Sequence, residues 1–114
     1  MSLSVRTGTL LLVVLTLVAC ARSPEAKKAR YLDRGDRYFQ KEQFREAVLE
    51  YRNALRIDGN NAQGNRQLGL TYYQLGQFVQ AVRFLTKAQE LDPDNTEVRL
   101  KLAKIGRASC RERV

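Results

Sequence analysis

Apolar residues recur at helical spacing through the middle of the chain. Between residues 44 and 55 the apolar side chains fall three or four positions apart, and the same spacing returns between residues 78 and 88. This spacing places them on one face of an amphipathic helix. Each stretch is preceded by another helical pattern, which carries Tyr38 in the first case and Tyr72 in the second. The pattern therefore predicts two helical hairpins.

The two predicted hairpins are copies of one unit of 34 residues. A shift of 34 places residues 28–61 over residues 62–95, and ten positions then hold the same residue, whereas chance would give about two. One shared position is Gly35 with Gly69, a small residue where two helices can approach closely. Gly76 suits the turn of the second unit because it has no Cβ, while Glu42 stands at the matching place in the first. Repeats of this length are typical of stacked helical hairpins.

Capping patterns mark where the helices begin and end. Ser23 followed by Pro24 predicts the start of the first helix. Pro93 cannot continue the helix before it, and the second unit therefore ends there. Asp94 followed by Glu97 predicts a capping box at the start of a third unit.

These residues resemble the tetratricopeptide repeat (TPR) family. The resemblance implies an all-α solenoid of helical hairpins, with full repeats over residues 28–61 and 62–95 and the start of a third over 96–104. The chain departs from the family pattern where Arg34 replaces Leu, Glu42 replaces Gly and Asn65 replaces a large residue. The second unit matches the pattern at Leu68, Gly69, Tyr72, Gly76, Phe78, Ala81, Ala88 and Pro93. The first matches at Tyr31, Gly35, Tyr38, Phe44, Ala47, Tyr51 and Ala54.

The amino-terminal segment has the pattern of a secretory signal. Residues 1–19 hold one charge and then an apolar run that is too short to span a bilayer. The four residues that end in Cys20, Leu-Val-Ala-Cys, resemble the lipobox of bacterial lipoproteins. The resemblance implies a diacylglyceryl group on Cys20, a membrane anchor with a short linker over residues 20–27, and export to the periplasmic side of the outer membrane, because Ala21 follows rather than Asp. An ordinary signal peptide beside an unrelated cysteine is the alternative.

The last ten residues, 105–114, follow neither an apolar period nor a turn pattern. The DNA string ATCGGAAGAGCGTCGTGTAGGGAAAGAGTG, which encodes them, resembles a widely used sequencing adapter. We therefore expect a non-native read-through tail there and a third repeat truncated near Lys104. A genuine basic tail is the alternative.

Composition argues against catalysis and nucleic-acid binding. The chain has a net charge of +8 and no His. Because His is absent, the chain lacks the commonest general base and the commonest metal ligand. We expect no enzyme activity, no cofactor and no metal. Basic and acidic side chains are intermixed along the helices, which is typical of a solvated face. Because the chain is also expected to be exported, nucleic acid is not an expected partner.

In the TPR family the first helices of successive repeats line a concave groove that binds a peptide or a helix of a partner. Leu32 and Leu70 stand where a carboxylate-binding clamp would need polar groups, so binding of a chaperone tail is not expected. The resemblance implies a groove formed by Leu32, Asp36, Phe39, Gln40, Arg66, Leu70, Tyr73 and Gln74. Alternatively, Phe39 and Tyr73 only pack between the repeats.

Two functional hypotheses follow. The first is a non-catalytic scaffold, anchored by lipid, that binds another envelope protein in a secretion, pilus-assembly or polysaccharide-export complex. The layout resembles that of pilotins and of TPR lipoproteins of exosortase-type systems, and the Ser-Pro-Glu opening and the stretch Tyr51–Leu55 favour the latter. The alternative is an amino-terminal module of a longer periplasmic enzyme whose catalytic part was lost with the truncation.

Overall fold

The computed structural model describes residues 8, 12–13 and 23–112, and this part of the chain is helical without strands. Cys20 and almost all of the expected signal segment lie outside the described residues. The all-α prediction is confirmed. The five helices of residues 23–112 are α2 (Pro24–Gln40), α3 (Phe44–Ile57), α4 (Ala62–Gln74), α5 (Phe78–Leu91) and α6 (Thr96–Glu112).

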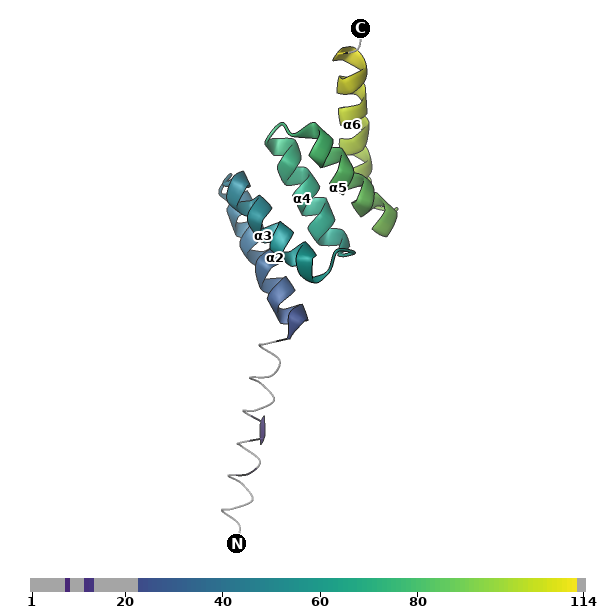
Figure 1. The fold of residues 1–114 in the computed structure, drawn as a ribbon. Coiled ribbons are helices and arrows are strands. Elements are labelled where there is room, and N and C mark those ends of the chain that lie inside the picture. The colour runs from purple at the N-terminus through teal and green to yellow at the C-terminus, as the bar shows by residue number, and fades with distance from the viewer. Residues whose placement is uncertain (1–7, 9–11, 14–22, 113–114) are drawn as a thin grey trace.

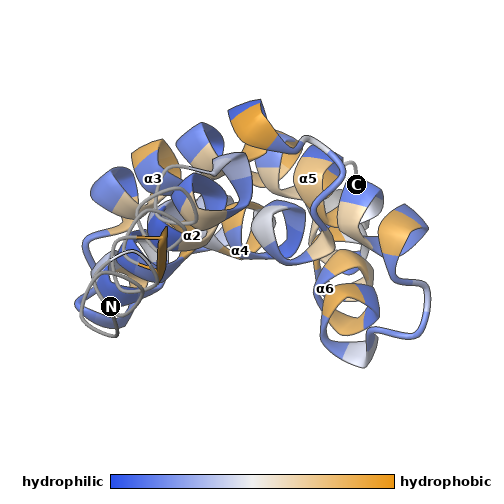
Figure 2. Ribbon diagram, turned by 90° about the horizontal axis from the view of Figure 1, so that it is seen from below, coloured by the Kyte–Doolittle hydropathy of each residue, from blue (hydrophilic) through white to orange (hydrophobic). Residues whose placement is uncertain are grey.

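The helices pair into antiparallel hairpins that stack side by side (Figure 1). Helices α2 and α3 form the first hairpin, α4 and α5 form the second, and α6 packs against α5 at the end of the stack. Helix α3 also packs against α4, which joins the two hairpins. Figure 2 shows an arc in which α2, α4 and α6 lie on the inner side, while α3 and α5 lie on the outer side. This is the arrangement that the repeat pattern predicts.

Each hairpin reverses direction through a residue with positive φ. Glu42 has a φ of 59° and Gly76 a φ of 72°. The two turns close with the same backbone bond: Gln43 N–H donates to Tyr38 O, and Gln77 N–H donates to Tyr72 O, both at 2.9 Å. The same turn is thus made in both repeats, although Glu42 carries a Cβ that disfavours this conformation.

Two glycines let the paired helices approach closely, as expected. A Cβ on Gly35 would lie 2.5 Å from Cε1 of Tyr51, and a Cβ on Gly69 would lie 2.7 Å from Cγ of Leu85. Tyr51 and Leu85 are fully buried. A buried large side chain of the second helix therefore rests directly on the glycine of the first helix in each hairpin.

Side-chain caps begin three of the helices. Ser23 Oγ accepts from Ala26 N–H at 3.2 Å, which confirms the predicted start of α2 at Pro24. Asn61 Oδ1 accepts from Gly64 N–H at the start of α4. At the start of α6 the cap is Asn95, whose Oδ1 accepts from Val98 N–H at 3.1 Å. The expected capping box at Asp94 is therefore wrong by one residue, and Asn61 and Asn95 cap at equivalent positions of the repeat.

Two helix boundaries in the structure differ from those expected from the sequence. Because α2 begins at Pro24, residues 24–27 are helical and do not belong to a linker. Helix α6 continues past Lys104 as far as Glu112. Ile105, expected to lie outside the repeat, is only 6% exposed and belongs to the core. The expectation that the helical pattern ends at Lys104 is wrong because Val98, Leu102 and Ile105 continue one apolar stripe toward α5.

The core follows the hairpin contacts. Its buried side chains include alanines from α3 and α5, as the pattern predicts, but Phe78 and Val82 of α5 are 49% and 38% exposed. These two residues belong to the predicted apolar stripe yet lie beside the end of the stack. The buried apolar residues are Leu32, Ala47, Val48, Tyr51, Ala54, Leu68, Leu70, Tyr72, Ala81, Leu85, Ala88, Val98 and Ile105.

Candidate functional site

A hollow of about 360 Å³ lies on the inner side of the arc and is lined by residues of α2, α4 and α6. It brings together five of the eight residues that the resemblance implies for the groove: Phe39, Arg66, Leu70, Tyr73 and Gln74. Three further residues line it that the sequence analysis did not select: Gln67, Glu97 and Lys101. We refer to these eight lining residues as the inner hollow.

The two aromatic residues of the inner hollow are each held by a second ring. Phe39 packs edge to face on Phe44, with ring centroids 5.3 Å apart. Tyr73 packs in the same way on Phe78 at 5.7 Å. Both ring contacts lie within one hairpin. Each ring stays half-buried and is still open to the hollow.

Charged groups line one side of the inner hollow. Lys101 Nζ lies 4.6 Å from the ring centroid of Tyr73, in a cation–π contact that ties α6 to α4. Arg66 has a buried Nε that makes no hydrogen bond among the described residues. Glu97 adds a carboxylate from the first turn of α6. The hollow thus combines an apolar floor at Leu70 with ionic and amide groups.

Asp36 supports the inner hollow from outside it. Its Oδ1 accepts from Tyr51 OH at 2.7 Å and from Gln67 Nε2 at 3.0 Å. One carboxylate oxygen therefore joins α2 to α3 and to α4, across the boundary between the repeats. Burial, followed by this hydrogen bond to Asp36, raises the pKa of the Tyr51 phenol well above its ordinary value, so it remains a neutral donor.

The remaining predicted groove residues divide between core and solvent. Leu32 is only 7% exposed, packs in the core and does not line the inner hollow. Leu70 is equally buried, although it also lines the hollow. Gln40 is exposed at the end of α2 and does not line the inner hollow.

Asn65 has a structural role that sequence reasoning missed. It replaces the large residue of the family pattern, is 3% exposed, and donates from Nδ2 to Gly59 O at 3.0 Å and to Asn61 O at 2.8 Å. The side chain thereby holds the loop before α4 against that helix. The departure from the family pattern was visible in the sequence, whereas the carbonyl partners were not.

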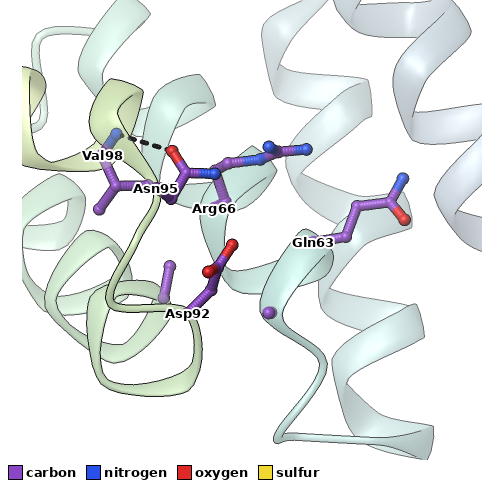
Figure 3. Close-up of a pocket in the computed structure, with 7 residues that line it drawn as sticks. Gln63, Arg66, Asp92, Asn95 and Val98 are labelled. Atoms are coloured by element: carbon purple, nitrogen blue, oxygen red, sulfur yellow. Dashed lines mark hydrogen bonds between the residues drawn. The ribbon is translucent and has the colours of Figure 1, made fainter.

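A second hollow of about 250 Å³ lies where α4, α5 and the loop before α6 meet (Figure 3). Arg66 lines both hollows. In Figure 3 Asn95 is engaged with Val98, and the carboxylate of Asp92 lies across the hollow from Gln63. This space is smaller than the inner hollow and has no aromatic wall.

The described residues contain neither a metal-binding cluster nor a membrane-spanning helix. No cluster of three or more His, Cys, Asp or Glu side chains there could hold a metal ion. No helix among the same residues is long and apolar enough to cross a membrane.

The stacked hairpins and the inner hollow define a helical-repeat protein of the kind that binds other polypeptides. Two family models match the chain: "TPR repeat" over residues 35–76 and "Tetratricopeptide repeat" over residues 63–95. The chain therefore contains tetratricopeptide repeats, as its sequence predicts, and such repeats generally mediate protein–protein interactions as non-catalytic scaffolds.

Several known proteins are similar to this chain in sequence or in structure. The solved Arabidopsis OM64 TPR domain superimposes with a TM-score of 0.73 at 22% identity, over 78% of this chain and 74% of that domain. Mouse Superkiller complex protein 3 is 34% identical over 94 residues, which are 82% of this chain and 6% of the mouse protein. Rat Sperm-associated antigen 1 is 31% identical over 84 residues, 72% of this chain and 9% of the rat protein. The chain thus spans less than one tenth of either curated relative.

Proposed function

We propose that this protein is a non-catalytic scaffold that binds a peptide or helix of another cell-envelope protein in the inner hollow. The observation that carries the proposal is the convergence of Phe39, Arg66, Leu70, Tyr73 and Gln74, which come from two repeats, on one concave surface. A surface formed by side chains of successive first helices is where solenoid proteins bind extended partners.

The chemistry of the inner hollow suits a polypeptide with apolar side chains. Leu70 and the open edges of Phe39 and Tyr73 offer apolar contact area. Gln67 and Gln74 carry amides that can pair with a peptide backbone, which has one donor and one acceptor for each residue other than proline. Specificity would come from these few polar groups, as is common in ligand sites.

We further propose that Cys20 carries the lipid that holds the repeats at the periplasmic side of the outer membrane. The support is the Leu-Val-Ala-Cys pattern after an apolar run in the sequence. Helix α2 begins at Pro24, so few residues would separate the anchor from the first repeat. A partner would then be bound close to the membrane surface.

The proposed site is tested by a photo-crosslinking side chain in place of Gln74, which is exposed beside the inner hollow. The chain is expressed in a Gram-negative host, and adducts are compared with those from the same group at Leu49, which is 61% exposed on the outer side of the arc. We expect adducts at position 74 that disappear when Phe39→Ala and Tyr73→Ala are combined. Equal adducts at positions 74 and 49 would contradict the site.

The anchor is tested separately. We expect the wild-type chain to partition into detergent with a diacylglyceryl mass on Cys20, and Cys20→Ser to remain in the aqueous phase. A wild-type chain without added lipid mass would contradict the anchoring proposal, but it would leave the inner hollow untouched.

A further inference from the structure

Three arginines and one leucine form a single exposed stripe along α3. Residues 45, 49, 52 and 56 recur four, three and four positions apart, so they fall within about 60° of one another around the helix axis. All four are exposed, and the leucine is 61% exposed. Because α3 packs on α2 and α4, which lie on the inner side of the arc, the stripe faces outward (Figure 2). We refer to Arg45, Leu49, Arg52 and Arg56 as the outer stripe.

The positive charge of the outer stripe is not neutralised within the described residues. Arg45 and Arg52 form no ion pair with a carboxylate there, and Arg56 bonds only to the amide oxygen of Asn53, at 3.5 Å. Glu46 borders the stripe on one side but pairs with none of the three arginines. The stripe therefore presents three cations and one apolar side chain to whatever lies outside the arc.

The same face of the next outer helix has a different chemistry. The positions 34 residues later, on α5, hold Val79, Arg83, Thr86 and Glu90, which are also exposed. One Arg and one Glu there cancel, whereas the three arginines of the outer stripe give a charge of +3. Because both helices occupy the same place in the repeat, its packing does not require the arginines. Their concentration on the first hairpin therefore calls for a ligand of that hairpin.

The outer stripe ends next to the start of α2, which follows the proposed anchor. Lys28 Nζ lies 3.0 Å from Oδ2 of Asp58, the residue after α3, so the beginning of α2 lies beside the end of α3. Arg56 belongs to that last turn of α3. Cys20 precedes Pro24 by four residues, a length of chain that extends at most about 14 Å. A lipid on Cys20 would therefore keep α3 within reach of the lipid headgroups.

We propose that the outer stripe docks on the anionic phospholipids of the leaflet that holds the anchor, with its guanidinium groups on headgroup phosphates and Leu49 inserted between the lipids. The inference rests on the anchor proposed at Cys20, which brings the stripe to a leaflet. Cationic side chains beside an apolar one are typical of helices that lie on membrane surfaces. An acidic protein fits less well, because the stripe ends beside the anchor, where lipid phosphate is the most concentrated anion.

Docking of the outer stripe would orient the whole repeat. The inner hollow lies on the opposite side of the arc and would point away from the membrane, toward a partner. A crosslinking group at Leu49 would capture lipid and not protein, so this position remains a control for protein adducts at the inner hollow.

A single introduced Trp reports the docking, because the chain has none. Leu49→Trp is compared with Val79→Trp, whose side chain is 86% exposed on the equivalent face of α5. Each 114-residue chain also carries Cys110→Ser, and its remaining thiol, Cys20, is coupled to a maleimide lipid in vesicles. The tether is thus supplied chemically, and the result does not depend on whether a cell adds lipid to Cys20.

The indole should respond at one position and on one lipid. On vesicles that contain phosphatidylglycerol, we expect the emission of Leu49→Trp to shift to shorter wavelength and to be quenched by brominated acyl chains. Val79→Trp should show neither effect. Vesicles of phosphatidylcholine alone should produce no shift in either variant, and high salt should reverse the shift because it screens the attraction.

Charge variants in the Leu49→Trp background test the arginines. Combining Arg45→Gln, Arg52→Gln and Arg56→Gln should lower the ratio of docked to undocked chain about hundredfold, because each arginine near an anionic leaflet contributes about fivefold. Lysine at the same three positions should preserve docking, since a leaflet attracts the charge and does not require the planar fork of the guanidinium.

The matched control removes three charges outside the first hairpin. Arg83→Gln, Arg99→Gln and Lys104→Gln change exposed positions of α5 and α6, and docking should be unchanged. Circular dichroism confirms that each variant keeps its helical content.

Three results would overturn the proposal. Equal shifts on the two kinds of vesicle would show that anionic lipid is not selected. Equal shifts in Leu49→Trp and Val79→Trp would show that the chain has no preferred face. A shift with soluble polyglutamate but not with vesicles would identify an acidic polypeptide as the ligand. If chains from cells carry no lipid on Cys20, the anchor proposal fails, while the coupled vesicles still decide whether the outer stripe binds a leaflet.

Discussion

Replacing Gly69 by Ala tests the close approach of α4 and α5 directly. The new Cβ would lie 2.7 Å from Cγ and 2.8 Å from Cδ2 of Leu85, and 3.0 Å from the Leu85 backbone nitrogen. Because one of these atoms belongs to the backbone of α5, a side-chain rotation cannot remove every contact. Overpacking of this kind costs about 1–3 kcal/mol, while alanine regains about 1 kcal/mol of helix propensity over glycine.

The matched control is Gly106→Ala in α6, where a Cβ would meet no atom within 4 Å. This variant should gain only the propensity, about 1 kcal/mol. The propensity cancels in the comparison, so the two variants should differ by about 1–3 kcal/mol, which is the steric cost at Gly69. Urea unfolding followed by circular dichroism at 222 nm measures both free energies of unfolding.

A double-mutant cycle with Leu85→Ala checks the physical cause. Truncating Leu85 alone should cost about 2–5 kcal/mol, because this side chain is fully buried. In the Gly69→Ala background the truncation should cost less, since it also removes the atoms that clash. Two results would refute the idea that Gly69 is needed for the close packing of Leu85. One is an equal change in the free energy of unfolding in Gly69→Ala and Gly106→Ala, and the other is strict additivity in the cycle.

Three other predictions concern stability. Asn65→Leu should destabilise the fold by about 1–3 kcal/mol in urea unfolding, because the carbonyls of Gly59 and Asn61 lose their donor; an unchanged midpoint would argue against this bracing. Ser23→Ala should lower the stability of α2 by about 1 kcal/mol, seen as faster amide exchange in its first turn only. Lys28 Nζ donates a hydrogen bond to Asp58 Oδ2 at 3.0 Å, and this bond lowers the pKa of the Asp58 carboxyl. The contact therefore stabilises the fold above the ordinary carboxyl pKa, and this stabilisation is lost as the pH falls through the lowered pKa. Urea midpoints of wild type and Asp58→Asn should therefore differ at pH 7 and converge as the pH falls through the lowered pKa of Asp58; a constant difference would contradict this linkage.

The hairpin architecture was predictable because it depends on residues that repeat every 34 positions. Gly35 and Gly69 mark the close contacts, and Gly76 marks a turn, and each of these effects is local and strong enough to be visible in one sequence. The turn at Glu42 was predictable only through the repeat, since the residue itself disfavours positive φ.

The site was predicted less completely, because it depends on contacts across the repeat boundary. Gln67 and Lys101 occupy the same position of successive repeats, so the 34-residue register could have selected them for the inner hollow. Nothing in the spacing showed that Asp36 would be used by Tyr51 and Gln67. The spacing of Val98, Leu102 and Ile105 could have indicated that α6 continues past Lys104, whereas the burial of Ile105 also requires α5 as a partner.

The interactions that stabilise this fold also shape its inner hollow before any partner arrives. Phe39 and Tyr73 each rest one face or edge on the first aromatic residue of the following helix and leave the remainder open. Lys101 of α6 is held by its contact with the Tyr73 ring, and Asp36 of α2 accepts a hydrogen bond from Gln67 of the second repeat. Because these side chains are already held, a bound peptide would lose little affinity to ordering of the protein. The remaining ordering cost would fall on the peptide, which favours partners that are already helical or confined near the surface.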